Sequence, residues 1–209
     1  MIILSHRGYW KATEEKNTET AFLRSFRLGF GTETDVRDHD GSLVISHDPP
    51  TSAALSLDRF LEIYREEGAG LPLALNIKAD GLQAALKGVL ARFQVTNYFT
   101  FDMSLPDMLH YFVQNIPVLT RQSEYEPQPL CYEQADGVWL DCFQGDWIDE
   151  QTVSGHLDAG KRVCIVSPDL HRRPHEAFWE TMAGWETRRS NRLLLCTDFP
   201  EDARARFQE

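Results

Sequence analysis

Short apolar runs alternate with amphipathic segments along the whole chain. Each run is rich in β-branched or aliphatic residues, which predicts buried strands at Ile2–Leu4, Thr32–Val36, Leu73–Ile77, Tyr98–Phe101, Pro117–Thr120, Gly137–Leu140, Arg162–Val166 and Leu193–Cys196. Between the runs, apolar residues recur at helical spacing, which predicts helices at Thr20–Leu28, Leu57–Glu66, Leu82–Arg92, Leu105–Val113, Asp149–Asp158 and Glu176–Trp185. Residues 122–134, which include two prolines, show no clear helical pattern.

Strands that alternate with helices predict a parallel sheet of the α/β class. Eight such strands predict a closed (β/α)₈ TIM barrel, at roughly 26 residues for each strand and helix, which is compact for that fold. The alternative is an open, doubly wound sheet. We find no linker, internal repeat or low-complexity segment, so residues 1–209 are expected to form one domain.

Polar residues at the ends of the predicted strands favour the barrel over the open sheet. They follow strand after strand, at His6, Arg7, Glu33, Asp35, Asn76, Lys78, Asp102, Arg121, Asp141, Ser167 and Asp198. A barrel builds its active site from the carboxyl ends of several strands, whereas an open sheet gathers its site at one switch point.

The composition narrows the partners that this chain can have. Its 209 residues carry a net charge of −11, which disfavours nucleic acid and anionic membrane surfaces as partners. A small anionic substrate is still compatible with a locally positive site or a bound metal. No apolar run is long enough to span a bilayer, and the apolar start Met1–Leu4 is too short for a secretory signal. The four cysteines form no CxxC pair, so we expect reduced, mostly buried thiols in a cytoplasmic protein.

Two clusters near the N-terminus carry the first chemical signal. His6 and Arg7 follow the first strand, where an arginine fork suits phosphate oxygens and a histidine can move a proton near neutral pH. Glu33 and Asp35 are two residues apart on a strand, so both carboxylates point to one face. A divalent cation, Mg²⁺ or Ca²⁺, would relieve the repulsion between them. Salt bridges to arginine or lysine, from Arg7, Arg37 or Lys78, are the alternative.

A second histidine can complete an acid and base pair. His47 precedes Asp48–Pro49 and follows the apolar run Leu43–Ile45, which comes after a turn at Asp40–Gly41. It would reach the same end of the sheet as His6 and supply the complementary general acid or base. His171, beyond the seventh predicted strand, either lines the pocket or is an ordinary loop residue.

Taken together, these motifs resemble the glycerophosphodiester phosphodiesterase family. The order of the family's motifs (HRG, PENT, ExD and HDP) is met by His6-Arg7-Gly8, Glu15-Lys16-Asn17-Thr18, Glu33-Thr34-Asp35 and His47-Asp48-Pro49. The second motif is only half matched, because Glu15 replaces its proline and Lys16 its glutamate. Lys78 after the third strand and Thr197-Asp198-Phe199-Pro200 after the eighth extend the resemblance over the whole chain.

The resemblance implies a (β/α)₈ barrel of the phospholipase-C-like phosphodiesterase type and a role for each matching residue. Glu33 and Asp35 would bind the divalent cation, and Arg7 and Lys78 would hold phosphate oxygens. His6 and His47 would be the general acid and base, in an order that the sequence does not assign. A phosphodiester gathers negative charge on its oxygens in the transition state, which agrees with this set of cations and proton carriers.

The chain departs from the family in two further places. Asn76 stands where the family commonly has a third metal-binding glutamate; its carbonyl oxygen can bind a hard cation but adds no charge. Glu124 and Asp141 are candidates to replace that acid, and each is equally compatible with an ordinary loop role. Only residues 50–72 separate the HDP motif from the third strand, so most of the family's usual insertion is missing there.

Three functions are compatible with this pattern. The first is a metal-dependent enzyme that hydrolyses glycerophosphodiesters, or a related small phosphodiester, to glycerol phosphate and an alcohol. The same scaffold could act instead on a lysophospholipid-type substrate. The third is a catalytically silent relative that binds a phosphorylated metabolite, which the asparagine at position 76 keeps open. Neither the released alcohol nor the oligomeric state follows from the sequence.

Overall fold

The computed structural model describes residues 1–207 in two compact units. One unit contains residues 1–4 and the chain from residue 119 onward, and the other contains Ser5–Val118. Strand β1 (Ile2–His6) therefore contributes residues to both units. The expectation of a single domain stays a prediction. No helix among residues 1–207 is both long and apolar enough to cross a membrane.

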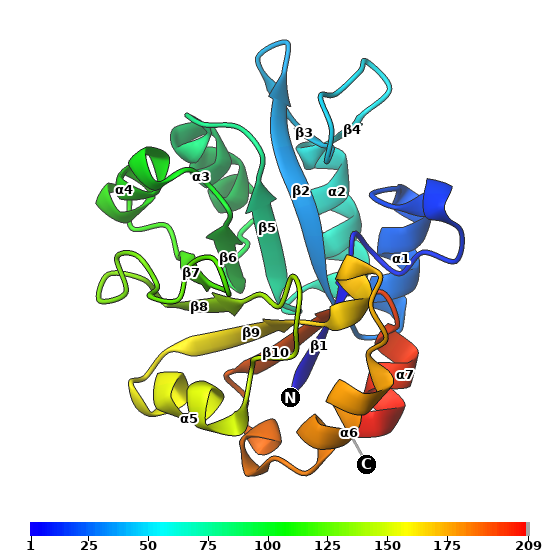
Figure 1. Ribbon diagram of the computed structural model, residues 1–209. Coiled ribbons are helices and arrows are strands. Elements are labelled where there is room, and N and C mark those ends of the chain that lie inside the picture. Colours follow the sequence, from blue (N-terminus) through cyan, green and yellow to red (C-terminus); the bar gives the residue numbers. More distant parts are fainter. Residues whose placement is uncertain (208–209) are drawn as a thin grey trace. The chain divides into compact units, whose positions relative to one another are not determined.

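The unit Ser5–Val118 is built around the long strand β2 (Gly31–His39; Figure 1). β5 (Leu73–Ile77) runs parallel to β2, and β6 (Tyr98–Phe101) runs parallel to β5. β3 (Ser42–Ile45) returns antiparallel to β2, and the short β4 (Leu55–Ser56) pairs with β3. Asp40 and Gly41 both have positive φ, as a two-residue turn between antiparallel strands requires.

Helices follow the strands of this unit. They are the 3₁₀ turn η1 (Thr13–Glu15), α1 (Glu19–Arg27), α2 (Leu57–Ile63), the π-helical turn η2 (Tyr64–Gly68), α3 (Gln83–Arg92) and α4 (Leu105–Val113). α1 packs on α2 through the buried rings of Phe22 and Phe60, whose centroids are 4.6 Å apart. Ser56 begins α2 by accepting a hydrogen bond from the backbone N–H of Arg59 at 3.1 Å.

The other unit contains a fully parallel run of strands. The order is β7 (Leu119–Gln122), β8 (Gly137–Leu140), β9 (Arg162–Val166) and β10 (Leu193–Thr197), each parallel to the next. Its helical segments are α5 (Glu150–Asp158), η3 (Pro168–His171), α6 (Glu176–Ala183), η4 (Glu186–Arg189) and α7 (Pro200–Phe207). Cys142, Cys164 and Cys196 are buried, and Cys131 is half-buried.

Every predicted strand and helix is present, with shifts at a few ends. β7 begins two residues later than predicted and extends to Gln122, because Arg121 and Gln122 pair with β8. α2 ends at Ile63, where the π-helical turn begins. The helix α7 is not among the predicted elements: it is short and mostly polar, and of its residues only Pro200, Ala203 and Phe207 are buried.

Candidate active site

The turn after β1 has a backbone shape that few residues adopt. Arg7 and Gly8 have φ values of 59° and 79°. A Cβ atom at Gly8 would lie 2.8 Å from Cβ of Ala21, so glycine allows α1 to approach. The Arg7 N–H consequently reaches β2, where it donates to the Glu33 carbonyl oxygen at 3.0 Å and to Glu33 Oε2 at 3.2 Å.

Glu33 and Asp35 lie on the same face of β2 and are almost fully buried, with side chains 2% and 0% exposed. Burial, and then the negative charge of Asp35, raises the pKa of Glu33 to about 7, although His6, Arg7 and Lys78 oppose the shift. Two buried carboxylates this close therefore need positive charge around them.

Part of that positive charge comes from Arg7 and Lys78. Arg7 Nε is 3.1 Å from Asp35 Oδ2, and Lys78 Nζ is 3.4 Å from Asp35 Oδ1. The salt bridges that the sequence left open as an alternative to metal binding are thus present for these two residues. Arg37 instead donates from Nε to the carbonyl oxygen of His47 at 3.2 Å.

Asn76 occupies the position on β5 that pairs in register with Asp35. Its side chain is buried, and Oδ1 has no hydrogen-bond partner among the described residues. An orphaned buried carbonyl oxygen costs free energy unless something binds it. An amide oxygen and two carboxylates are donor types that suit a hard divalent cation. Residues 1–207 contain no group of three His, Cys, Asp or Glu side chains placed to hold a metal ion.

The two histidines lie in different surroundings. His6 is largely buried, and its Nε2 is 4.0 Å from Glu33 Oε2. The His47 side chain is 43% exposed, and its Nδ1 lies 2.8 Å from Asp48 Oδ1. The contact with Asp48 orients the His47 ring and leaves Nε2 as the nitrogen that can exchange a proton with a ligand.

Asn17 links β2 to the turn after β1. The sequence identified this residue only as part of the half-matched second motif. Its Nδ2 donates to Asp35 Oδ2 and its Oδ1 accepts from Thr34 Oγ1, both at 2.9 Å. Its backbone N–H donates to the carbonyl oxygen of Arg7 at 2.9 Å. The φ of 60° at Asn17 suits asparagine, which tolerates left-handed backbone better than most residues. The segment before α1 is thereby tied to β2 and to the turn after β1.

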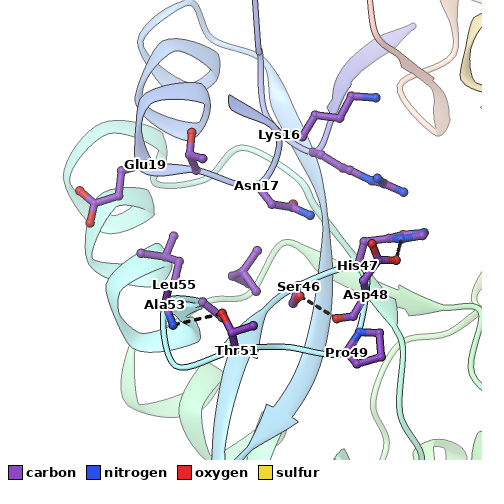
Figure 2. A pocket seen from close by; sticks show the side chains of 14 residues that line it. Lys16, Asn17, Glu19, Ser46, His47, Asp48, Pro49, Thr51, Ala53 and Leu55 are labelled. Atoms are coloured by element: carbon purple, nitrogen blue, oxygen red, sulfur yellow. Dashed lines mark hydrogen bonds and ion pairs between the residues drawn. The ribbon is translucent and has the colours of Figure 1, made fainter. Parts of the chain in front are cut away.

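A cavity of about 520 Å³ opens beside these residues (Figure 2). Lys16, Asn17 and Glu19 lie on one side, and the segment from Ser46 to Leu55 lies on the other. Arg7 and His47 also line it, so the cavity adjoins two of the predicted site residues. Its size is in the range of small-molecule sites.

The remaining candidates belong to the other unit. Asp141, just after β8, is 8% exposed in its side chain, and its Oδ1 lies 2.6 Å from Nε2 of His171. Glu124 accepts hydrogen bonds from three successive backbone N–H groups, of residues 143, 144 and 145, at 2.9 to 3.1 Å. Burial alone would raise the pKa of Glu124, but these hydrogen bonds hold it below its ordinary value. This geometry favours the loop role for Glu124 over metal binding, and Asp141 is engaged with a histidine.

The solved structures similar to this chain include three phosphodiesterases. A glycerophosphodiester phosphodiesterase from Agrobacterium tumefaciens str. C58 has a TM-score of 0.75 and is 16% identical, with 100% of both chains covered. An Oleispira antarctica phosphodiesterase in complex with the product sn-glycerol-3-phosphate has a TM-score of 0.70 and is 17% identical, over 100% of this chain and 97% of that one. A glycerophosphodiester phosphodiesterase from Thermotoga maritima has a TM-score of 0.62 and is 18% identical, over 98% of each chain.

These likenesses confirm the fold class predicted from the sequence, a (β/α)₈ barrel. No protein-family model and no curated protein matches the chain. At 16 to 18% identity the structural likeness establishes the fold. The chemistry must be argued from the residues themselves.

Proposed function

We propose that this protein is a glycerophosphodiester phosphodiesterase: a metal-dependent enzyme that hydrolyses a glycerophosphodiester to glycerol phosphate and an alcohol. The observation that carries the proposal is the buried oxygen cluster of Glu33, Asp35 and Asn76 on two neighbouring strands, with a histidine and two cations next to it. The fold shared with three phosphodiesterases supports it. We further propose a cytoplasmic location, which four cysteines without a CxxC pair support.

Glu33, Asp35 and Asn76 would hold the cation, Mg²⁺ or Ca²⁺. When bound, the cation would neutralise negative charge on a phosphate oxygen. Two carboxylates and one amide make this set less charged than one with three carboxylates, so we expect a modest affinity. Burial of both carboxylates orients them without the need for loop closure.

Arg7 and Lys78 would bind the phosphate. Both lie against Asp35, so a phosphate that enters beside this carboxylate meets both cations. The left-handed turn fixes the Arg7 backbone on β2, and the Lys78 N–H donates to the carbonyl oxygen of Val36 at 3.0 Å. The backbones of Arg7 and Lys78 are therefore fixed, which reduces the conformational entropy that these residues would lose on binding phosphate.

His6 and His47 would transfer the protons. One takes a proton from the attacking water or from a neighbouring substrate hydroxyl, as the new P–O bond forms. The other gives a proton to the alkoxide that leaves when the P–O bond to the alcohol breaks. Glu33 lies beside His6 and Asp48 lies beside His47, so each ring has a carboxylate next to it.

The test is the hydrolysis of glycerophosphocholine, glycerophosphoethanolamine and an aryl phosphodiester, with Mg²⁺, with Ca²⁺ and with a chelator. We expect turnover that the chelator abolishes and that His6→Ala and His47→Ala each reduce by at least about 100-fold. Arg37→Ala is a matched control, because Arg37 Nε donates to the backbone carbonyl oxygen of His47 and not to its ring. If no diester is hydrolysed but glycerol phosphate binds measurably, the protein is a silent relative of the enzymes.

A further inference from the structure

The cavity in Figure 2 has a wall that the proposed reaction does not use. Its far side is formed by the loop from Pro49 to Leu55, which carries no charged side chain. Its near side is formed by Lys16 and by the start of α1. Because Arg7 and His47 line the same cavity, a substrate held by Arg7 could extend one of its ester groups into this space.

Both acidic groups that line the cavity have partners. The two carboxylate oxygens of Glu19 accept hydrogen bonds from Arg59, each at 2.9 Å. Asp48 Oδ1 lies 2.8 Å from His47 Nδ1. Two cations, Arg7 and Lys16, also line the cavity, and Arg7 is paired with Asp35.

Trp10 supports the Lys16 side chain. The Lys16 ammonium lies 4.3 Å from the centroid of the Trp10 ring, a cation–π contact that limits the positions it samples. The indole Nε1 donates in turn to the carbonyl oxygen of His6 at 3.2 Å, so the ring is anchored to the proposed active site. Lys16 is thus held at the edge of the cavity rather than extended freely into water.

We propose that Lys16 selects phosphodiesters whose alcohol group carries a negative charge. The inference rests on the proposed function and concerns the part of the substrate that leaves. A carboxylate or second phosphate on the alcohol would be attracted by Lys16, whereas a cationic alcohol such as choline would be repelled. The resemblance to the phosphodiesterase family sharpens the contrast, since the matching position there is a glutamate.

The experiment compares three glycerophosphodiesters, of ethanol, ethanolamine and 3-hydroxypropionate, which present a neutral, a cationic and an anionic alcohol. For Lys16→Met we expect kcat/KM for the anionic ester to fall about tenfold, the size that one partly screened charge gives at close range. The neutral ester should change less than twofold, and the cationic ester should be hydrolysed faster. Lys16→Arg should retain the wild-type order.

Lys11→Met is the matched control. It removes the same charge five residues away, from an exposed side chain that lies over Tyr9 and does not line the cavity. An equal loss on all three esters in Lys16→Met would overturn the inference, because it would mean that Lys16 acts on the common phosphate or on folding. If the wild-type protein hydrolyses none of the three, the proposed function fails and the inference fails with it.

Discussion

Asn17→Ala is expected to destabilise the protein more than any ordinary change in a surface loop. The substitution removes two side-chain hydrogen bonds, one to the buried carboxylate of Asp35 and one from Thr34. A hydrogen bond to a charged group contributes about 1.5 to 3 kcal/mol and a neutral one about 1 kcal/mol. An alanine at a φ of 60° costs about 1 kcal/mol more. Since Asn17 is only half-buried, we take the lower figures and expect a loss of about 3.5 kcal/mol.

The assay is urea unfolding, with the free energy of unfolding extrapolated to water. Asn115→Ala is the matched control, because Asn115 is an exposed asparagine with a φ of 54°. Asn115→Ala also places an alanine at positive φ but removes no contact with β2, so its free energy of unfolding should fall by about 1 kcal/mol. If Asn17→Ala loses no more than Asn115→Ala, the hydrogen bonds to Thr34 and Asp35 contribute nothing, and the reasoning is refuted.

Two further predictions concern the metal ligands and the pH dependence of stability. Asn76→Glu should tighten Mg²⁺ or Ca²⁺ binding, measured by calorimetry, by about tenfold or more, because it adds a charge to the cluster; unchanged affinity would show that Asn76 is not a ligand. His156 Nε2 donates to Gln122 Oε1 at 2.8 Å, Nδ1 lies 2.9 Å from Tyr132 Oη, and burial lowers the pKa of His156. Below about pH 6.5, His156 therefore binds a proton more readily in the unfolded chain than in the folded protein. The free energy of unfolding of the wild type should fall with decreasing pH more steeply than that of His156→Gln. Equal slopes of unfolding free energy between pH 7.5 and 5 would contradict this assignment.

Strands and site residues near the N-terminus could be predicted because each depends on local sequence. Buried strands show as apolar runs, and Glu33 and Asp35 share a face because strand side chains alternate. Asn76 was expected at the same end of the sheet because it lies near the end of the next predicted strand, and the resemblance to the phosphodiesterase family marked it as a position for a metal ligand. Its pairing in register with Asp35 is a finding of the structure.

The partners of the site residues could be predicted only as alternatives. Arg7 and Lys78 were expected to bind phosphate or, with Arg37 as a third choice, to form salt bridges with the carboxylates, and the structure places Arg7 and Lys78 against Asp35. Which of several nearby cations binds a buried carboxylate depends on side-chain packing in three dimensions. The partners of Glu124 could not be predicted from the sequence either. The backbone N–H groups that donate to it belong to a loop about twenty residues further along the chain.

The central claim is that a divalent cation bound by Glu33 and Asp35 enables hydrolysis of glycerophosphodiesters. Phosphorus NMR of glycerophosphoethanolamine follows both the loss of the diester and the appearance of glycerol phosphate. With Mg²⁺ or Ca²⁺ present, we predict conversion by the wild-type protein, and at most trace conversion by Asp35→Asn or after chelation. Conversion that persists undiminished in chelator and in Asp35→Asn would contradict the account.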